Sequence, residues 1–151
     1  MLLLPEGAKL IGQGLTGSEG SRCLPRMLSY GTRVVAGVTP GKGGQTMEGI
    51  PIFNTLSEAI QKVGKVQGIV QFVPPKFVFD ATKEAIDEGI RWILVGAEKV
   101  PVKDMAILYA MAQKKNVSII GPSSVGLINP RKKLGIGLIA AANTAKAYAE
   151  G

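Results

Sequence analysis

The residues best suited to chemistry in this sequence are glycines and one lysine. Residues 12–17 read Gly-Gln-Gly-Leu-Thr-Gly, which matches the pattern G-x-G-x-x-G, and they follow an apolar run at 9–12. Glycines at this spacing let the backbone approach a phosphate while the N–H groups of a following helix point at it. Thr16 and Ser18 add hydroxyl groups. The stretch favours a phosphate-binding loop over a tight turn without a ligand.

A second glycine-rich loop carries the lysine. Residues 39–44 read Thr-Pro-Gly-Lys-Gly-Gly, a string that cannot form a helix and requires positive φ angles. A dinucleotide site normally places Asp or Glu about 20 residues after the first glycines, to bind the ribose hydroxyls. Here the strand expected at 33–38 is followed by no acid, and the first ionised residue after it is Lys42. This argues against NAD and for a ligand with an additional phosphate, which NADP and coenzyme A both carry. The loop is not a Walker A motif, because Gly43 stands where a magnesium-binding Ser or Thr is required.

Several kinds of enzyme are excluded by composition. The 151 residues contain no histidine, which removes His-containing metal sites, Ser-His-Asp triads and histidine acid/base catalysis. Lys and Arg number 18 against 11 Asp and Glu, a formal charge of +7, so a compact polyanion is a suitable ligand. The lone Cys23 cannot form an internal disulfide, and we expect a small semi-buried residue there rather than a nucleophile.

Nucleic acid and membranes are not expected partners. Aromatic residues make up 5% of the chain, too few for base stacking, and the tight basic cluster at 131–133 is typical of a solvated turn. No apolar run approaches the roughly 20 residues of a membrane helix. The absence of a secretion signal or transit peptide predicts a cytoplasmic protein, or one of the mitochondrial matrix if the source is a eukaryote.

The pattern along the chain predicts an α/β fold, a doubly wound and mostly parallel sheet flanked by helices. Strands are expected at 9–12, 33–38, 66–73, 91–95 and 117–120, with a short extended piece at 51–53 and a sixth strand at 136–139. Helices are expected at 21–30, 55–63, 77–88 and 102–115. Pro25 is expected in about the first turn of the first helix, and Asn54 or Thr55 as the cap of the second, with Glu58 completing a capping box. Residues 1–140 are read as one domain and 141–151 as a helix or tail.

Ligands of such sheets bind beyond the carboxyl ends of the strands, near the point where strand order reverses. We therefore expect a cationic side chain and unhindered amides to converge at this edge. The loops that form it are predicted at 12–20, 39–49, 73–76 and 96–101, with 121–126 beside them. The acidic residues of helix 77–88, namely Asp80, Glu84, Asp87 and Glu88, are interpreted as a solvated face.

Several motifs together resemble a known family. They are Thr16-Gly17-Ser18-Glu19-Gly20, the run from Gly37 to Gly44, the run from Gly49 to Thr55, Phe72-Val73-Pro74-Pro75, the run from Glu84 to Ile90 and Ile120-Gly121-Pro122. In this order they are similar to the N-terminal CoA-binding domain of the succinyl-CoA synthetase α subunit. Related domains occur in ATP-citrate lyase and other NDP-forming acyl-CoA synthetases. The likeness extends from about residue 8 to 139.

The resemblance implies a Rossmann-like domain that binds coenzyme A. Its phosphates would be held by the glycine loop, at Thr16, Gly17, Ser18 and Glu19, and by Lys42. The adenosine and pantetheine parts would be flanked by Val73 and Pro74 and by Gly96, Ala97 and Glu98.

Departures from the family limit what the chain can do alone. The family's α subunit continues into a second domain with a phosphorylated histidine, and this chain has no histidine, so no complete catalytic apparatus is expected and no catalytic residue is assigned. Residues 121–126 lack the family's asparagine, so contacts near the thiol end are expected to differ. The resemblance implies a part of an acyl-CoA ligase that needs a second domain or larger subunit. The alternatives are the NADP-binding half of an oxidoreductase and a CoA-sensing or docking module without catalysis. A homo-oligomer is possible in each case.

Overall fold

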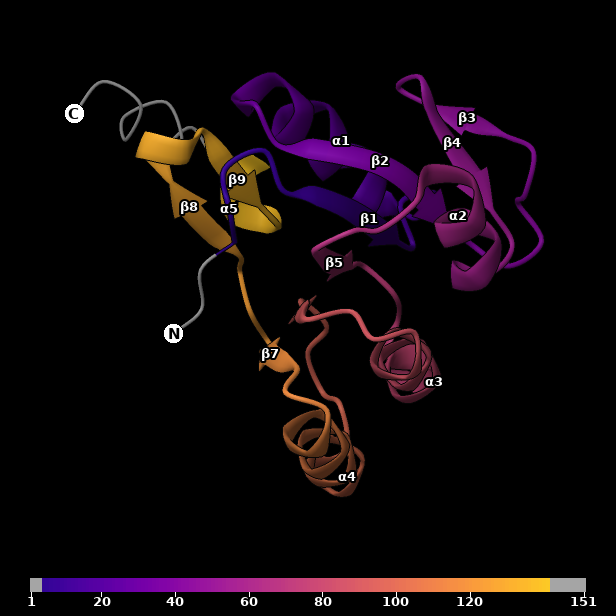
Figure 1. Ribbon diagram of the computed structural model, residues 1–151, viewed down its shortest axis with the longest axis vertical. Coiled ribbons are helices and arrows are strands. Elements are labelled where there is room, and N and C mark those ends of the chain that lie inside the picture. The colour runs from indigo at the N-terminus through magenta and orange to yellow at the C-terminus, as the bar shows by residue number, and fades with distance from the viewer. Residues whose placement is uncertain (1–3, 142–151) are drawn as a thin grey trace.

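The computed structural model describes residues 4–141 and contains one large sheet (Figure 1). In spatial order, its seven strands are β3 (Thr46–Met47), β4 (Ile50–Phe53), β2 (Arg33–Val38), β1 (Lys9–Gln13), β5 (Gly68–Gln71), β6 (Trp92–Val95) and β7 (Ser118–Ile120). All pairs are parallel except β3–β4. The predicted α/β class is confirmed.

The strand order reverses beside β1. The chain runs outward from β1 through β2 to β4, and then returns to the other side of β1 to build β5, β6 and β7. The carboxyl ends of β1 and β5 therefore flank the switch point, the usual place for a ligand in an open α/β sheet. Gln13, the last residue of β1, is paired with Val38 of β2 and Gln71 of β5.

Helices cover both faces of the sheet (Figure 1). One face packs against α2 (Leu56–Val63), α3 (Pro75–Asp87) and α4 (Val102–Lys114). The other packs against α1 (Ser18–Tyr30), the small helix α5 (Leu138–Ala141) and a hairpin of β8 (Leu127–Asn129) and β9 (Leu134–Ile136), whose strands are joined by the 3-10 helix η1 (Pro130–Lys132). Because successive strand residues point to opposite faces, buried apolar side chains alternate between the two cores.

Local signals in the sequence explain where the helices begin and end. Helix α1 ends at Gly31, whose φ of +113° few other residues adopt. Thr55 caps α2 by accepting a hydrogen bond from the Glu58 N–H at 3.2 Å. Helix α3 begins at Pro75, where the missing N–H does least harm. The predicted helix at 55–63 is confirmed in its position and its cap.

Three local predictions were wrong. Helix α1 begins at Ser18 rather than residue 21, so Pro25 lies in the middle of the helix and not in its first turn. Pro75 begins α3 two residues earlier than predicted. The expected strand at 136–139 is β9 at Leu134–Ile136, which pairs with β8 outside the main sheet. Gly137 has a φ of +81°, which ends the extended chain there.

The C-terminal segment is described only in part. Ala140 and Ala141 belong to α5, and the rest of the expected helix or tail lies outside the described residues. Within residues 4–141, no helix has both the length and the apolar character that crossing a membrane requires.

Candidate functional site

A cavity of about 640 Å³ lies at the carboxyl edge of the sheet, at the switch point. This volume is within the roughly 300–1,000 Å³ of typical small-molecule sites. The walls come from the ends of β1, β2 and β5 and from one side of α3. They comprise Gln13, Gly14, Thr16, Gly17, Val38, Thr39, Pro40, Asn54, Phe72, Val73, Pro74, Phe77, Asp80, Ala81 and Glu84.

The two glycine loops are tied together at this cavity. The Gly14 N–H donates to the Val38 carbonyl at 2.9 Å, and the Thr16 hydroxyl donates to Thr39 Oγ1 at 3.1 Å. Gly14 has a φ of +78°, and a Cβ there would lie 2.9 Å from the Phe72 carbonyl oxygen. Only glycine therefore lets the first loop pass this close to the end of β5.

The amino end of α1 offers unoccupied amides beside the cavity. Gly17 is the N-cap residue and supplies no side-chain cap. Because the first N–H groups of a helix lack intrahelical partners, those of Ser18 and Glu19 are left for a ligand or solvent at the positive end of the helix dipole. Ser18 and Glu19 are exposed and lie next to the cavity rather than in its wall. This end of α1 can hold a phosphate.

The backbone amides of the Lys42 loop were expected to be free for a ligand, but they are hydrogen-bonded within the protein. The N–H groups of Gly41 and Gly43 both donate to Asn54 Oδ1 at 3.0 Å, that of Lys42 to the Thr39 carbonyl at 3.0 Å and that of Gly44 to the Ile52 carbonyl at 3.0 Å. The amides of this loop therefore hold the loop itself. What the loop offers a ligand is the exposed Lys42 side chain, which makes no ion pair within residues 4–141.

The predicted site residues divide into those that line the cavity and those around it. Thr16, Gly17, Val73 and Pro74 line it, while Lys42, two residues after Pro40 of the wall, is not among the lining residues. Gly96, Ala97 and Glu98 lie after β6, one strand further along, and are not in the wall. There the Ala97 carbonyl accepts from the Ser123 N–H at 2.9 Å, so this segment packs against the 121–126 loop.

One acidic residue of α3 departs from the prediction of a solvated face. Asp80, Asp87 and Glu88 are exposed, as predicted, whereas Glu84 is only partly exposed. Asp80 and Glu84 both line the cavity. Glu84 Oε1 accepts from the Leu56 N–H at 3.0 Å, at the amino end of α2. A carboxylate at this wall disfavours a phosphate and suits a hydroxyl or amino donor instead.

A buried polar chain below the cavity was also missed by sequence reasoning. Gln71 Nε2 donates to Gln13 Oε1 at 2.8 Å, and the Thr82 hydroxyl donates to Gln71 Oε1 at 3.0 Å. All three residues are at least 98% buried. The available signal was a glutamine at the end of each of two otherwise apolar strands. These hydrogen bonds fix the ends of β1 and β5 against α3.

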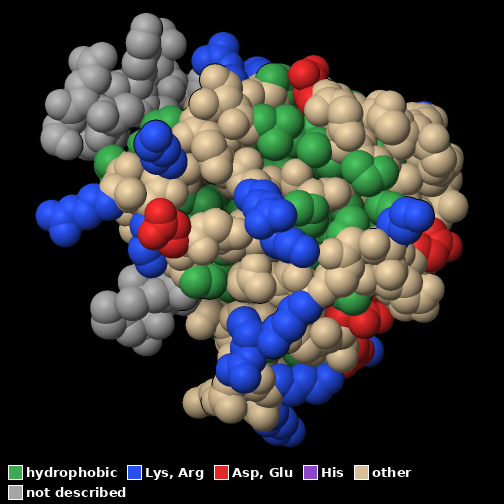
Figure 2. Space-filling view, turned by 45° about the horizontal axis from the view of Figure 1, so that its top comes forward, with side chains coloured by type: hydrophobic (Ala, Val, Ile, Leu, Met, Phe, Trp, Pro, Cys, Tyr) green, Lys and Arg blue, Asp and Glu red, His purple; other side chains and the backbone are tan. Residues whose placement is uncertain are grey.

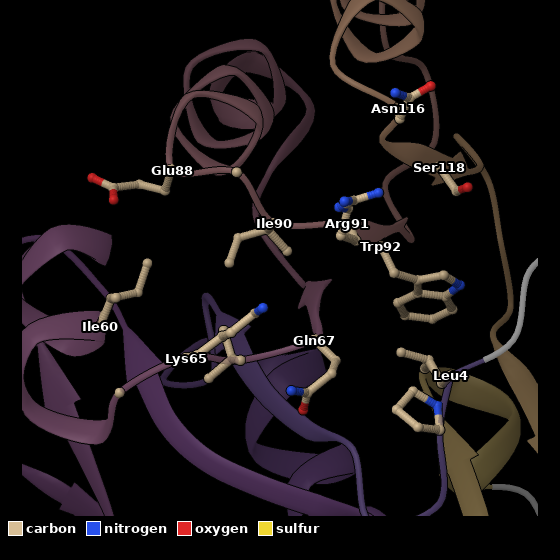
Figure 3. A pocket seen from close by; sticks show the side chains of 14 residues that line it. Leu4, Ile60, Lys65, Gln67, Glu88, Ile90, Arg91, Trp92, Asn116 and Ser118 are labelled. Carbon is tan, nitrogen blue, oxygen red and sulfur yellow. The ribbon is translucent and has the colours of Figure 1, made fainter.

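A larger cavity, of about 850 Å³, lies at the opposite edge of the sheet (Figure 3). It is bordered by the segments that follow the carboxyl ends of α2, α3 and α4, with Lys65, Arg91 and Trp92 in its lining. Helix carboxyl ends carry partial negative charge, and Lys65 and Arg91 are placed to balance that charge. The smaller cavity, which adjoins a helix amino end, is the better phosphate site.

Lys and Arg side chains outnumber acidic ones on one face of the molecule, the face that Figure 2 shows.

Cys23 is not among the residues that line the cavity. It is fully buried on α1, and burial raises the pKa of its thiol. The interpretation of Cys23 as a buried apolar residue agrees with this placement.

Comparison with known proteins assigns the family. Residues 6–99, which contain both glycine loops and all the residues of the cavity wall, match the description "CoA binding domain". The chain belongs to this CoA-binding domain family. It is 44% identical over 138 residues to the α subunit of an ADP-forming succinate–CoA ligase of Aquifex aeolicus, a match covering 89% of this chain and 45% of that subunit.

Two further proteins are similar to this chain of the CoA-binding family. The α subunit of malate–CoA ligase of Methylorubrum extorquens is 37% identical over 137 residues, which is 88% of this chain and 46% of that subunit. The structure of ATP citrate lyase from Methanothrix soehngenii in complex with citrate and coenzyme A has a TM-score of 0.81 at 23% identity, over 95% of this chain and 25% of that one. The expected homology with acyl-CoA ligase α subunits is confirmed, and the chain spans less than half of each ligase subunit.

Proposed function

We propose that this CoA-binding domain binds coenzyme A itself, as a substrate, at the carboxyl edge of the sheet. The observation that carries the proposal is the cavity between the uncapped amino end of α1 and the Lys42 loop. It combines a helix end for anions, a Lys42 side chain that makes no ion pair among the described residues, and a mostly apolar wall. Coenzyme A needs all three, because it joins several phosphate charges to an adenosine and a long, mostly uncharged pantetheine arm.

The phosphates are assigned to the two loops. The amides at Ser18 and Glu19 suit a pyrophosphate at the start of α1. Lys42 is assigned to the phosphate on the ribose, which is close to doubly charged at neutral pH. The bond between Thr16 and Thr39 keeps these two anion sites at a fixed separation.

The organic part of the ligand is assigned to the cavity and its continuation past β6. Val73, Pro74 and the half-exposed Phe77 offer apolar contact. Asp80 and Glu84 provide acceptors for the amino or hydroxyl groups of adenosine. The remaining arm would extend along Gly96, Ala97 and Glu98 toward the 121–126 loop, where the thiol would emerge.

The chemistry is assigned to a larger assembly. We propose that residues 1–140 form the CoA-binding domain of an acyl-CoA ligase, in which the thiol sulfur attacks an acyl phosphate formed elsewhere and inorganic phosphate leaves. The two relatives are named for different acids, succinate and malate. Selection of the acid is therefore assigned to the part of the ligase beyond this domain.

Calorimetric titration of the chain with coenzyme A, dephospho-coenzyme A and NADPH tests the proposal. We expect coenzyme A to bind about tenfold tighter than dephospho-coenzyme A, the equivalent of about 1.4 kcal/mol for one charged contact. Equal affinities would contradict the role of Lys42. Absence of heat with both would remove the proposal, and binding of NADPH alone would instead support the oxidoreductase alternative.

A further inference from the structure

We propose that Asn54 is a positioning residue that gives the site its preference for a phosphorylated ribose, by holding the Lys42 loop in place. The inference rests on the proposed function. It concerns a residue that does not need to touch the ribose phosphate, and that no motif in the sequence identified as part of the site.

One oxygen atom of Asn54 fixes the backbone on both sides of Lys42. Asn54 Oδ1 accepts hydrogen bonds from the N–H groups of Gly41 and Gly43, each at 3.0 Å. The N–H of Lys42 itself donates to the Thr39 carbonyl at 3.0 Å. Three consecutive peptide groups are therefore tied down at the base of the lysine side chain, while its ammonium group has no acid partner within residues 4–141.

The loop is shaped around the asparagine. A Cβ on Gly43 would lie 2.5 Å from Asn54 Nδ2 and 2.7 Å from its Cγ, so glycine is required for the amide to approach. Gly41 and Gly44 have φ angles of +80° and +86°, with no atom within 4 Å of an added Cβ. These two glycines therefore serve the backbone turn, whereas Gly43 makes room for Asn54.

Asn54 is in turn held by the first turn of α2. Its own N–H donates to Glu58 Oε2 at 3.1 Å, while the Glu58 N–H donates to Thr55 Oγ1 at 3.2 Å. This is a variant of the capping box, in which the glutamate reaches the residue before the N-cap. A rigid helix thus positions Asn54, and Asn54 positions the loop that carries Lys42.

This arrangement affects phosphate selectivity because a lysine side chain is long and flexible. Fixing its backbone reduces the freedom that must be lost when the ammonium group meets a phosphate. A ligand without the ribose phosphate does not meet Lys42 and gains nothing from the fixed loop. Removing the Asn54 side chain should therefore weaken coenzyme A binding and leave dephospho-coenzyme A binding almost unchanged.

The first test is the Asn54→Ala variant, titrated with both ligands. We expect the Kd for coenzyme A to rise about three- to tenfold, the scale of one lost hydrogen-bonding group, and that for dephospho-coenzyme A to change less than about twofold. In a Lys42→Ala background, Asn54→Ala should leave the ratio of the two Kd values unchanged. Asn129→Ala is the matched control, since Asn129 Oδ1 caps η1 by accepting from the Lys132 N–H at 3.2 Å, on the β8–β9 hairpin.

The second test follows the loop without any ligand. Hydrogen exchange of the Gly41 and Gly43 amides, measured by NMR, should become faster in Asn54→Ala. It should stay slow in Asn54→Asp, which keeps the acceptor oxygen. It should also become faster in Glu58→Ala but not in Glu58→Gln, which keeps the acceptor for the Asn54 N–H. Unchanged exchange in Asn54→Ala would overturn the inference. So would an equal loss of affinity for both ligands.

If the unaltered chain binds no coenzyme A, the proposed function fails and the inference fails with it. If it binds and the selectivity of Asn54→Ala is unaltered, the inference alone fails.

Discussion

The hydroxyl of Thr16 donates a hydrogen bond to Thr39 Oγ1 at 3.1 Å and so joins the loop after β1 to the loop after β2. The two residues are 23 positions apart in the sequence. The first loop leads to the amino end of α1 and the second carries Lys42. The bond therefore sets the distance between the two groups to which the phosphates are assigned.

Replacing Thr16 by Val should separate the two loops with little change in side-chain volume. We expect coenzyme A affinity to fall about three- to tenfold and the free energy of unfolding to fall by about 0.5–1.5 kcal/mol, the usual cost of one net hydrogen bond. Calorimetry and urea unfolding measure the two effects. Thr46→Val, at an exposed position of β3, is the control and should change neither. An unaltered affinity in Thr16→Val would mean that the hydroxyl bond does not organise the site.

Replacing Gly20 by Ala should destabilise the chain although alanine is the better helix former. A Cβ at Gly20 would lie 2.5 Å from the Gly14 carbonyl oxygen and 2.5 Å from Leu15 Cα, both backbone atoms. We expect the clash to cost about 1–3 kcal/mol, more than the roughly 1 kcal/mol gained in helix propensity. Urea unfolding of Gly20→Ala and of Ser21→Ala, an exposed position in the same turn, decides the point. Greater stability in Gly20→Ala would show that α1 does not pack this tightly on the glycine loop.

Asp87 should give the domain a small, salt-sensitive stability that acid removes. Hydrogen bonds from Lys83 at 2.6 Å and Lys115 at 2.9 Å lower the pKa of Asp87 from its ordinary 3.8. Because the folded-state pKa is the lower one, the contribution is present above pH 3.8 and is lost as the pH falls through the lowered pKa. Chemical unfolding of Asp87→Asn should show lower stability than the parent at pH 7, and the difference should shrink in acid and in high salt. A difference that persists at low pH would contradict the ion-pair origin.

Trp92, the sole tryptophan of the sequence, reports on the cavity at the amino edge (Figure 3). Because coenzyme A is assigned to the other edge, its binding should leave the emission spectrum of Trp92 unchanged at concentrations that saturate the calorimetric signal. Trp92→Phe should bind coenzyme A with the affinity of the parent. A quenched or shifted emission, lost in step with binding, would place the ligand in the larger cavity instead.

Elements specified by neighbouring residues could be predicted from the sequence. Thr55 and Glu58 define the start of α2 through a cap that spans three residues, and Gly31 defines the end of α1 through its φ of +113°. The start of α1 was misplaced because Gly17 carries no capping side chain and Pro25 was taken for an early-helix proline. The same missing cap leaves the α1 amides open to a ligand.

Contacts between distant segments could not be predicted in this way. Asn54 was interpreted only as a possible helix cap, and its bonds to Gly41 and Gly43 depend on how β2 and β4 pair. Asp80 and Glu84 have the spacing of a solvated face, and only the placement of α3 beside β5 turns them into the cavity. The glycine pattern and the charge of Lys42 predicted the two loops, and the family resemblance assigned them to the phosphates of coenzyme A. Neither predicted that the amides of the Lys42 loop hold the loop itself.

The proposed contact between Lys42 and the ribose phosphate is decided by titrating Lys42→Ala with coenzyme A and dephospho-coenzyme A. Lys62→Ala, in the last turn of α2, is the matched control and should bind both ligands as the parent does. We predict that Lys42→Ala binds coenzyme A more weakly by about 1–3 kcal/mol and dephospho-coenzyme A with unchanged affinity. Unchanged affinity for coenzyme A, or an equal loss for both ligands, would mean that Lys42 does not bind the ribose phosphate.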